Sequence, residues 1–194
     1  MIEPTAGDAL IIVDVQQDFL PGGALPVDGG DRIIPVLNRY IERFRRLGLP
    51  IVATRDWHPP NHCSFLTQGG PWPPHCVAGT PGARFSETLQ LPQDTIIISK
   101  ASDPEQEAYS GFQHTDLESR LRRMGVKRLF IGGLATDYCV LNTVREALAR
   151  GFEVFLLTDA IRAVNASPGD EQKALQEMQR LGVQPMTVDE LARA

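Results

Sequence analysis

Short apolar runs alternate with helical segments along this chain, and this alternation limits the folds that it can adopt. Each run is about five residues long and rich in β-branched residues, as expected for a strand that is buried on both faces. The six runs lie at residues 9–13, 51–54, 95–99, 126–131, 153–157 and 183–188. Apolar residues recur at helical spacing in four segments, at 33–47, 115–125, 140–151 and 168–181. The pattern predicts an α/β fold with three layers, α/β/α, around a six-stranded, mainly parallel sheet.

The composition is that of one globular domain spanning residues 1–194, with 42% hydrophobic and 22% charged residues. No run is long enough for a transmembrane helix, and the N-terminus lacks the pattern of a signal peptide. A formal charge of −5 gives no general attraction to nucleic acid or to an anionic membrane. Three cysteines do not suit a disulfide framework, so a reducing, cytoplasmic setting is expected.

One long segment breaks the alternation, at about residues 59–92. Together with Trp57 and His58 just before it, the segment holds both tryptophans and three of the four histidines among many prolines and glycines, with little periodicity. A loop of this length inside a compact domain is usually functional. We therefore expect the domain to carry a metal-binding loop insertion at about residues 56–92.

Three chemically active side chains each follow a different predicted strand. Asp14, Lys100 and Cys139 stand just after apolar runs. Because ligands of parallel α/β sheets bind beyond the carboxyl ends of the strands, we expect an acid, an amine and a thiol at one edge. Asp14 alone would more often cap a helix, and Lys100 alone would more often lie on the surface. Their joint placement favours a catalytic site.

Cys139 lies where a strand turns into a helix. The N-terminal end of a helix carries partial positive charge and free N–H donors, which lower a thiol pKa and stabilise an oxyanion. A buried, inert cysteine is the alternative interpretation. A base and a cation beside the thiol, supplied here by Asp14 and Lys100, favour the nucleophile. No histidine follows Cys139 in the chain, so a Cys–His pairing is less natural.

Asp56, His58, His62 and His75 lie in or just before the long loop. Carboxylate and imidazole together are good ligands for a divalent metal. Asp56 and His58 are two residues apart after a strand, so that both side chains can point the same way. The residues thus indicate an open site of the catalytic or substrate-binding type.

A closed structural zinc site is the competing interpretation, because Cys63 and Cys76 each follow a histidine of the loop. Adjacent side chains in an extended backbone point to opposite sides, so either the two histidines or the two cysteines face a common metal. Only the histidine choice lets Asp56 and His58 join, which favours the open site.

Five segments of the chain resemble the nicotinamidases, also called pyrazinamidases. They are Val-Asp-Val-Gln-Gln-Asp-Phe at 13–19, Arg-Asp-Trp-His-Pro at 55–59, Ser-Lys at 99–100, Ala-Tyr-Ser-Gly-Phe at 108–112 and Gly-Gly-Leu-Ala-Thr-Asp-Tyr-Cys-Val at 132–140. These enzymes are the metal-containing branch of the isochorismatase-like cysteine hydrolases. The resemblance runs in register from about residue 9 to residue 160, and it implies an isochorismatase-like fold with a Rossmann-like strand order.

The resemblance implies Asp14 as the general base, Lys100 as its cationic partner and Cys139 as the nucleophile. The thiolate would attack an amide carbonyl, ammonia would leave, and water would release the acid from a thioester. The family also implies an oxyanion hole made by the backbone N–H groups of Ala135 and Cys139. This hole is built on a cis peptide bond between Leu134 and Ala135.

The resemblance further implies one divalent metal ion held by Asp56, His58 and His75, with His62 as a fourth candidate. Zinc is the expected metal, and iron and manganese are compatible with the same ligands. In the family, the metal positions the pyridine ring of the substrate and is not the main catalyst.

Four residues are expected to bind the substrate by the same resemblance. Phe19 and Trp72 are placed against the substrate ring, Tyr109 near the pocket wall, and Leu25 completes the set. Asp18 either orients groups of the active site or caps its turn.

The predicted function is hydrolysis of nicotinamide to nicotinate and ammonia in NAD salvage, with pyrazinamide as an accepted analogue. The partner is thus a small pyridine carboxamide, and the chain is compatible with a homo-oligomer. One alternative keeps the thiol but takes another small amide or a carbamoyl or ureido compound, without metal. The other is a non-catalytic domain with structural zinc. An isochorismate-type vinyl ether hydrolase is disfavoured, because Cys139 and the histidines would have no task.

Overall fold

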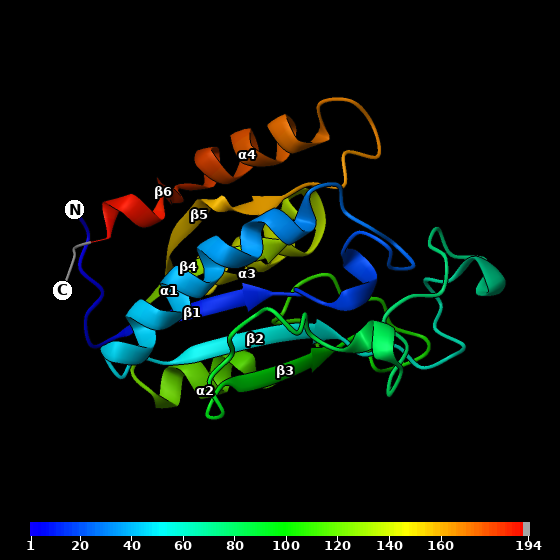
Figure 1. Ribbon diagram of the computed structural model, residues 1–194, viewed down its shortest axis with the longest axis horizontal. Helices are drawn as coiled ribbons and strands as arrows, with labels where there is room; N and C mark the ends of the chain where they lie inside the picture. The colour runs from blue at the N-terminus through cyan, green and yellow to red at the C-terminus, as the bar shows by residue number, and fades with distance from the viewer. Residues whose placement is uncertain (192–194) are drawn as a thin grey trace.

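The computed structural model describes residues 1–191, which form a six-stranded sheet flanked by helices (Figure 1). The strands are β1 (Asp8–Val13), β2 (Ile51–Asp56), β3 (Ile96–Lys100), β4 (Arg128–Leu134), β5 (Glu153–Arg162) and β6 (Gln184–Met186). Their order is β3-β2-β1-β4-β5-β6, and every neighbouring pair is parallel. This confirms the predicted α/β class and its Rossmann-like order.

The helices lie close to the predicted segments. They are α1 (Ile34–Arg46), α2 (Leu117–Arg123), α3 (Leu141–Ala149) and α4 (Asp170–Leu181). Single 3₁₀ turns occupy Gln17–Phe19, Gly30–Ile33, Leu66–Gln68, Pro81–Ala83 and Val188–Glu190. Helix α2 begins two residues later than predicted, with Asp116 as its N-cap. The Thr115 hydroxyl lies just before it, where it donates to the Gly111 carbonyl and accepts from the Leu117 N–H at 3.3 Å. Within residues 1–191, every helix is too short or too polar to cross a membrane.

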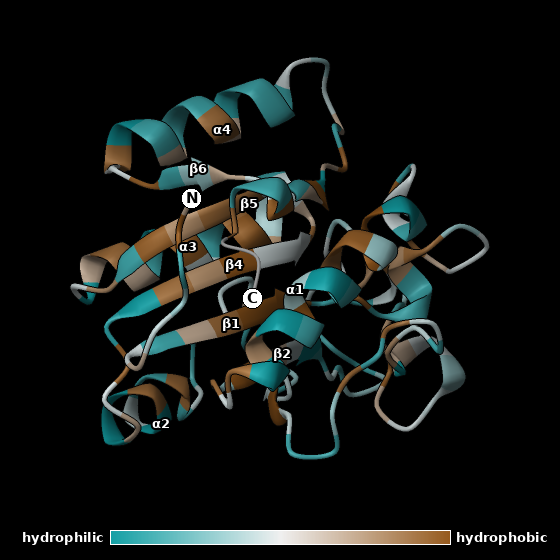
Figure 2. Cartoon of the chain, turned by 60° about the vertical axis from the view of Figure 1, so that its left-hand side comes forward, coloured by the Kyte–Doolittle hydropathy of each residue, from teal (hydrophilic) through white to brown (hydrophobic). Residues whose placement is uncertain are grey.

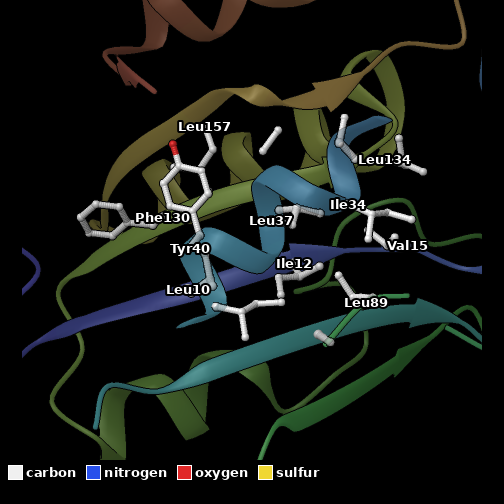
Figure 3. Packing of buried hydrophobic residues seen from close by; sticks show 14 of the residues in the cluster. Leu10, Ile12, Val15, Ile34, Leu37, Tyr40, Leu89, Phe130, Leu134 and Leu157 are labelled. Carbon is white, nitrogen blue, oxygen red and sulfur yellow. The ribbon is translucent and has the colours of Figure 1, made fainter. Parts of the chain in front are cut away.

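The alternating side chains of β1 show that the sheet separates two hydrophobic cores. Successive side chains of a strand point to opposite faces. Leu10 and Ile12 pack with Leu37 and Tyr40 of α1 (Figure 3), whereas Ile11 contributes to the cluster that includes residues of α2, α3 and α4. Figure 2 shows the apolar strands between helices whose outer faces are largely hydrophilic. A strand buried on both faces therefore appears in the sequence as one continuous apolar run.

Strand β4 runs three residues beyond its predicted end at 131. Gly132 and Gly133 follow the predicted strand in the sequence, but both lie within β4. Gly133 has a φ of +126°, and a Cβ there would lie 2.2 Å from the carbonyl oxygen of Val13. Glycine is needed because β1 and β4 approach each other closely at this point. The extension carries the chain to the cis Leu134–Ala135 bond.

The carboxyl ends of β1, β2 and β3 point to one end of the molecule, where the long loop between β2 and β3 gathers (Figure 1). Ligands of such sheets bind at this edge, outside the strand ends. The fold thus places the loop that is rich in histidine beside the polar residues that follow the strands.

Candidate active site

Four functional side chains are brought together by the ends of four adjacent strands. Asp14 directly follows β1, while Asp56 and Lys100 are the last residues of β2 and β3. Cys139 lies in a single π-helical turn, Thr136–Val140, between β4 and α3. Such turns inside helices are frequent at functional sites. The predicted strand-to-helix position of Cys139 is confirmed, with a wider first turn than expected.

The ammonium group of Lys100 lies at the centre of this group. Its Nζ is 2.8 Å from Asp14 Oδ2, 2.5 Å from Asp56 Oδ1 and 3.4 Å from Cys139 Sγ. It also donates to the carbonyl oxygen of Ala108 at 3.2 Å. All of these side chains are buried. The acid, amine and thiol predicted from separate strand ends therefore form one cluster, and the cluster also includes Asp56.

Burial controls the ionisation of this cluster. It raises the pKa of Asp14, and the attraction of Lys100 only partly opposes this. Burial would lower the pKa of Lys100, but the carboxylates of Asp14 and Asp56 reverse the effect and hold that pKa well above its usual value. Lys100 therefore stays charged, and Asp14 is more easily protonated than an exposed aspartate.

The expected depression of the Cys139 pKa is wrong. Burial raises the pKa of the Cys139 thiol well above its usual value, and Lys100 lowers it less than burial raises it. Cys139 is only 6% exposed, so water solvates a resting thiolate poorly. A base is therefore needed to take the proton as the nucleophile forms.

Asp56, His58 and His75 place one potential ligand atom each within 4.8 Å of one another. Both histidine Nε2 atoms lie 4.0 Å from Asp56 Oδ2. The Nδ1 atom of His58 contacts the His75 carbonyl at 2.9 Å, and that of His75 contacts the Pro73 carbonyl at 2.7 Å. Since carbonyls only accept, each Nδ1 carries the hydrogen and each Nε2 keeps its lone pair.

These donors fit a divalent cation. Burial lowers the pKa of His58 to about 4, so that its ring is neutral at physiological pH, as a metal ligand must be. The two carboxylate oxygens of Asp56 have different neighbours: Oδ1 faces Lys100, and Oδ2 faces the histidines. One carboxylate and two imidazoles leave positions for other ligands, which is the pattern of an open site.

His62 lies beside this group but outside it. Its Nε2 contacts the Gln106 carbonyl at 3.0 Å, and its Nδ1 accepts from Ser64, whose Oγ is 2.7 Å away. Both ring nitrogens of His62 thus have other partners in this arrangement. The role of His62 as a fourth ligand stays a prediction.

The closed cysteine site is not formed in residues 1–191, because neither Cys63 nor Cys76 joins a group of three potential ligands there. Cys76 packs with the apolar cluster that includes residues of α1, and its backbone has a φ of +47°. Burial raises the pKa of Cys76, and this disfavours a metal thiolate.

A cavity lies next to these groups. Its volume is about 450 Å³ when the open space at its entrance is included. Its wall combines the reactive and ligating side chains with apolar and aromatic ones. The lining residues are Phe19, Leu25, Val27, Asp56, His58, Trp72, His75, Glu107, Tyr109, Ala135, Tyr138, Cys139 and Val164. Thiol, carboxylate and imidazoles therefore face one cavity, together with apolar and aromatic side chains of the kind that line small-ligand sites.

The comparisons with known proteins agree with this geometry. The model of the isochorismatase domain matches residues 8–190. The chain belongs to the isochorismatase family. The zinc complex of a pyrazinamidase from Pyrococcus horikoshii has a TM-score of 0.90 at 56% identity, covering 93% of this chain and 99% of that one. The nicotinate complex of PnC1 from L. infantum has a TM-score of 0.91 at 37% identity, covering 98% of each chain.

A curated relative supports the same family assignment. The nicotinamidase of Escherichia coli K12 is 38% identical over 195 residues, which cover 90% of this chain and 92% of that protein. The resemblance inferred from the five sequence segments is therefore confirmed for nearly the whole chain.

All four residues predicted to bind substrate, Phe19, Leu25, Trp72 and Tyr109, line the cavity of this isochorismatase-family chain. The indole N–H of Trp72 donates to the Tyr109 hydroxyl at 3.0 Å. The ring of Tyr138 packs against Trp72 edge to face, with centroids 5.2 Å apart. These aromatic contacts hold one wall of the cavity in place.

Sequence reasoning missed four lining residues: Val27, Glu107, Tyr138 and Val164. Tyr138 had a signal, because it directly precedes Cys139 and lies in the same turn. Val164 had none, since it follows β5 and reaches the cavity only through tertiary packing. The cis Leu134–Ala135 bond is present, and both Ala135 and Cys139 line the cavity. That the backbone N–H groups of Ala135 and Cys139 form an oxyanion hole stays a prediction.

Proposed function

We propose that this protein is a nicotinamidase, which hydrolyses nicotinamide to nicotinate and ammonia and accepts pyrazinamide in the same way. One observation carries the proposal. The Cys139 thiol and the Asp56–His58–His75 cluster face the same small aromatic cavity, with Lys100 touching both Cys139 and Asp56. A flat pyridine ring with a carboxamide matches a cavity that has a nucleophile on one side and metal ligands on another.

In the first half of the reaction, the carboxylate of Asp14 takes the proton of the Cys139 thiol as the sulfur attacks the carboxamide carbon. The new oxyanion accepts hydrogen bonds from the backbone N–H groups of Ala135 and Cys139. The C–N bond then breaks, and Asp14 returns the proton to the departing nitrogen, so that ammonia and a thioester form. The raised pKa of Asp14 supports this role, because the same group takes and gives the proton.

In the second half, a water molecule replaces ammonia. Asp14 removes one proton from this water as its oxygen attacks the thioester carbon, and the C–S bond breaks to leave the carboxylic acid and the sulfur of Cys139. The proton on Asp14 then restores the thiol. Lys100 stays protonated throughout and stabilises the negative charge that passes between Asp14 and Cys139.

We assign Asp56, His58 and His75 as the residues that would hold a divalent metal, with zinc as the proposed ion. A cation bound there would supply a Lewis-acid contact for the ring nitrogen of the substrate. Phe19, Trp72 and the neighbouring lining residues would hold the ring flat and exclude water.

The test is ammonia release from nicotinamide by purified protein, with the metal content measured on the same sample. The assay is repeated after dialysis against a chelator and again after Zn²⁺ is restored. We expect release that is lost on chelation and recovered with Zn²⁺. Cys139→Ala should reduce the rate of ammonia release by at least about 10³-fold, because the nucleophile is gone. Cys63→Ala should leave this rate unchanged.

Two outcomes would contradict the proposal. A folded, zinc-loaded protein that releases no ammonia from nicotinamide would remove this substrate and turn the search to carbamoyl compounds. Substantial ammonia release by Cys139→Ala would show that the thiol is not the nucleophile.

A further inference from the structure

One turn, residues 16–18, contacts both segments that carry the proposed metal ligands. Gln16 directly precedes the 3₁₀ residues Gln17–Phe19 and is fully buried, while Asp18 lies within them and is partly buried. Neither side chain faces the cavity, and neither has a role in the proposed reaction. Both nevertheless bind the backbone of ligand segments far away in the sequence.

Gln16 binds both backbone groups of Asp56. Its Oε1 accepts from the Asp56 N–H at 2.8 Å, and its Nε2 donates to the Asp56 carbonyl at 2.8 Å. The second hydrogen of Nε2 goes to the Ala83 carbonyl at 3.0 Å. The primary amide of Gln16 thus continues the pairing of β2 at the point where its last residue must direct one oxygen to Lys100 and the other to the histidines.

Asp18 binds the backbone next to His75. Its Oδ2 accepts from the Cys76 N–H at 2.7 Å, a short charge-assisted bond, and its Oδ1 accepts from the Ala24 N–H at 3.2 Å. Cys76 has a φ of +47°, which is uncommon for residues other than glycine, and such a conformation persists only where its surroundings hold it.

The same backbone segment also orients His58. The His58 N–H donates to the Cys76 carbonyl at 3.0 Å, and its Nδ1–H donates to the His75 carbonyl at 2.9 Å. The position of the 75–76 segment therefore determines where both imidazoles point. Space for the Asp18 carboxylate depends on Gly82, where a Cβ would lie 2.2 Å from Asp18 Oδ2.

We infer that the turn of residues 16–18 is a positioning element for the metal site: Gln16 places Asp56, and Asp18 places the segment that carries His75. Outer-shell partners of this kind typically change metal affinity by about 10–100-fold when they are removed. The inference rests on the proposed function for its assumption that the three ligands bind a divalent cation. It concerns affinity for that cation and not the chemistry at Cys139.

The test measures the Kd of the apoprotein for Zn²⁺ by competition with a chelating dye, without substrate. Gln16→Glu keeps the shape of the side chain but removes the donor to Asp56 and Ala83, and Asp18→Ala removes the acceptor of the Cys76 N–H. We expect each change to raise the Kd for Zn²⁺ by about tenfold or more. The increase in Tm that saturating Zn²⁺ produces should shrink in proportion.

Two matched controls make the same chemical changes elsewhere. Asn38→Asp alters a side-chain amide that binds the Thr88 carbonyl and the Gln90 N–H, each at 2.9 Å. Asp170→Ala removes a carboxylate that accepts from the Ser167 N–H at 2.8 Å. Both controls should leave the Kd for Zn²⁺ within about threefold of the original value, even where they lower the Tm of the apoprotein.

The inference is overturned if Asp18→Ala folds and keeps its Kd for Zn²⁺ within the range of the controls, whatever its Tm. If Gln16→Glu does not fold, Asp18→Ala alone decides the question, because Asp18 is less buried. A wild-type protein that binds no Zn²⁺ would also overturn it. Tight Zn²⁺ binding that depends on both residues, without hydrolysis of nicotinamide, would keep this inference and remove the proposed function.

Discussion

The side-chain nitrogen of Lys100 lies 3.4 Å from the sulfur of Cys139, and both side chains are buried. The same ammonium contacts the carboxylates of Asp14 and Asp56. One positive charge therefore contacts the proposed nucleophile, its proposed base and a proposed metal ligand. A buried charge is tolerated only when it is paired, so this arrangement ties stability to chemistry.

Replacing Lys100 should damage both stability and activity. Lys100→Met leaves the carboxylates of Asp14 and Asp56 buried without their cation, and breaking a buried pair in this way typically costs about 3–5 kcal/mol. We expect the free energy of unfolding to fall by about that amount and kcat/KM to fall by at least about 10²-fold, an order typical of electrostatic groups in active sites. Denaturant unfolding and ammonia release measure the two effects.

The control for this prediction is Lys127→Met, which removes an exposed lysine. It should change the free energy of unfolding by no more than about 0.5 kcal/mol and leave kcat/KM unchanged. Wild-type stability in Lys100→Met would contradict the assignment of Lys100 as the shared counterion.

The histidines of the loop should differ in their importance for metal binding. His75→Ala removes an Nε2 lone pair directed at the proposed site, so we expect the Kd for Zn²⁺ to rise by at least about 100-fold. His62→Ala should raise it by less than about tenfold, because both nitrogens of His62 have other partners. Dye competition with the apoprotein measures both. Equal losses would make His62 a ligand.

Removal of the metal should abolish activity and keep the fold. The proposed ligands lie at strand ends and in a loop outside the two hydrophobic cores. Far-UV circular dichroism of the chelated protein should match that of the loaded protein. Unfolding on chelation is the outcome expected of a structural zinc domain and would contradict an open site.

The Trp72–Tyr109 hydrogen bond should tune substrate affinity. Trp72→Phe and Tyr109→Phe each remove one partner of the 3.0 Å bond while keeping an aromatic ring. We expect each to raise KM by about three- to tenfold, the equivalent of a bond worth about 1 kcal/mol, with little change in kcat. Expressed as free energies, the KM increase of the double variant should be smaller than the sum of the two single increases, because both changes remove the same bond. Fully additive effects would mean that the two rings act independently.

Tyr40 should make stability depend on alkaline pH. Burial, with the neighbouring Asp159 carboxylate, raises the pKa of Tyr40 above its ordinary value of 10.0, and its hydroxyl donates to Asp159 at 3.1 Å. Above pH 10 the unfolded chain loses this proton before the folded protein does. Its stabilising contribution is therefore complete below pH 10 and falls above it, by up to about 1.4 kcal/mol per pH unit.

The check for Tyr40 is denaturant unfolding at pH 8, 10 and 11. Tyr40→Phe should be less stable by about 1 kcal/mol at pH 8, because one hydrogen bond is lost. The difference between the two proteins should shrink as the pH rises, since the variant has no phenol to ionise at this position. Parallel curves across this range would contradict the assignment.

The class of fold and the candidate reacting groups could both be predicted from the sequence. An apolar run buried on both faces and the polar residue that ends it are local features, so Asp14, Lys100 and Cys139 are visible without coordinates. Their meeting follows from topology, because parallel strands end at the same edge of the sheet. Five family segments in order added the expected ligands and the substrate class.

Tertiary structure alone decided the details that depend on long-range packing. The loop that carries the histidines has little periodicity, so only its contacts show that His75 groups with Asp56 and His58 while both ring nitrogens of His62 have other partners. Strand β4 passes through Gly133 because β1 approaches it there, which no local pattern reveals. The raised pKa of the Cys139 thiol also results from long-range packing. A helix terminus is visible in a sequence, but the burial that outweighs it arises only when distant segments close around the sulfur.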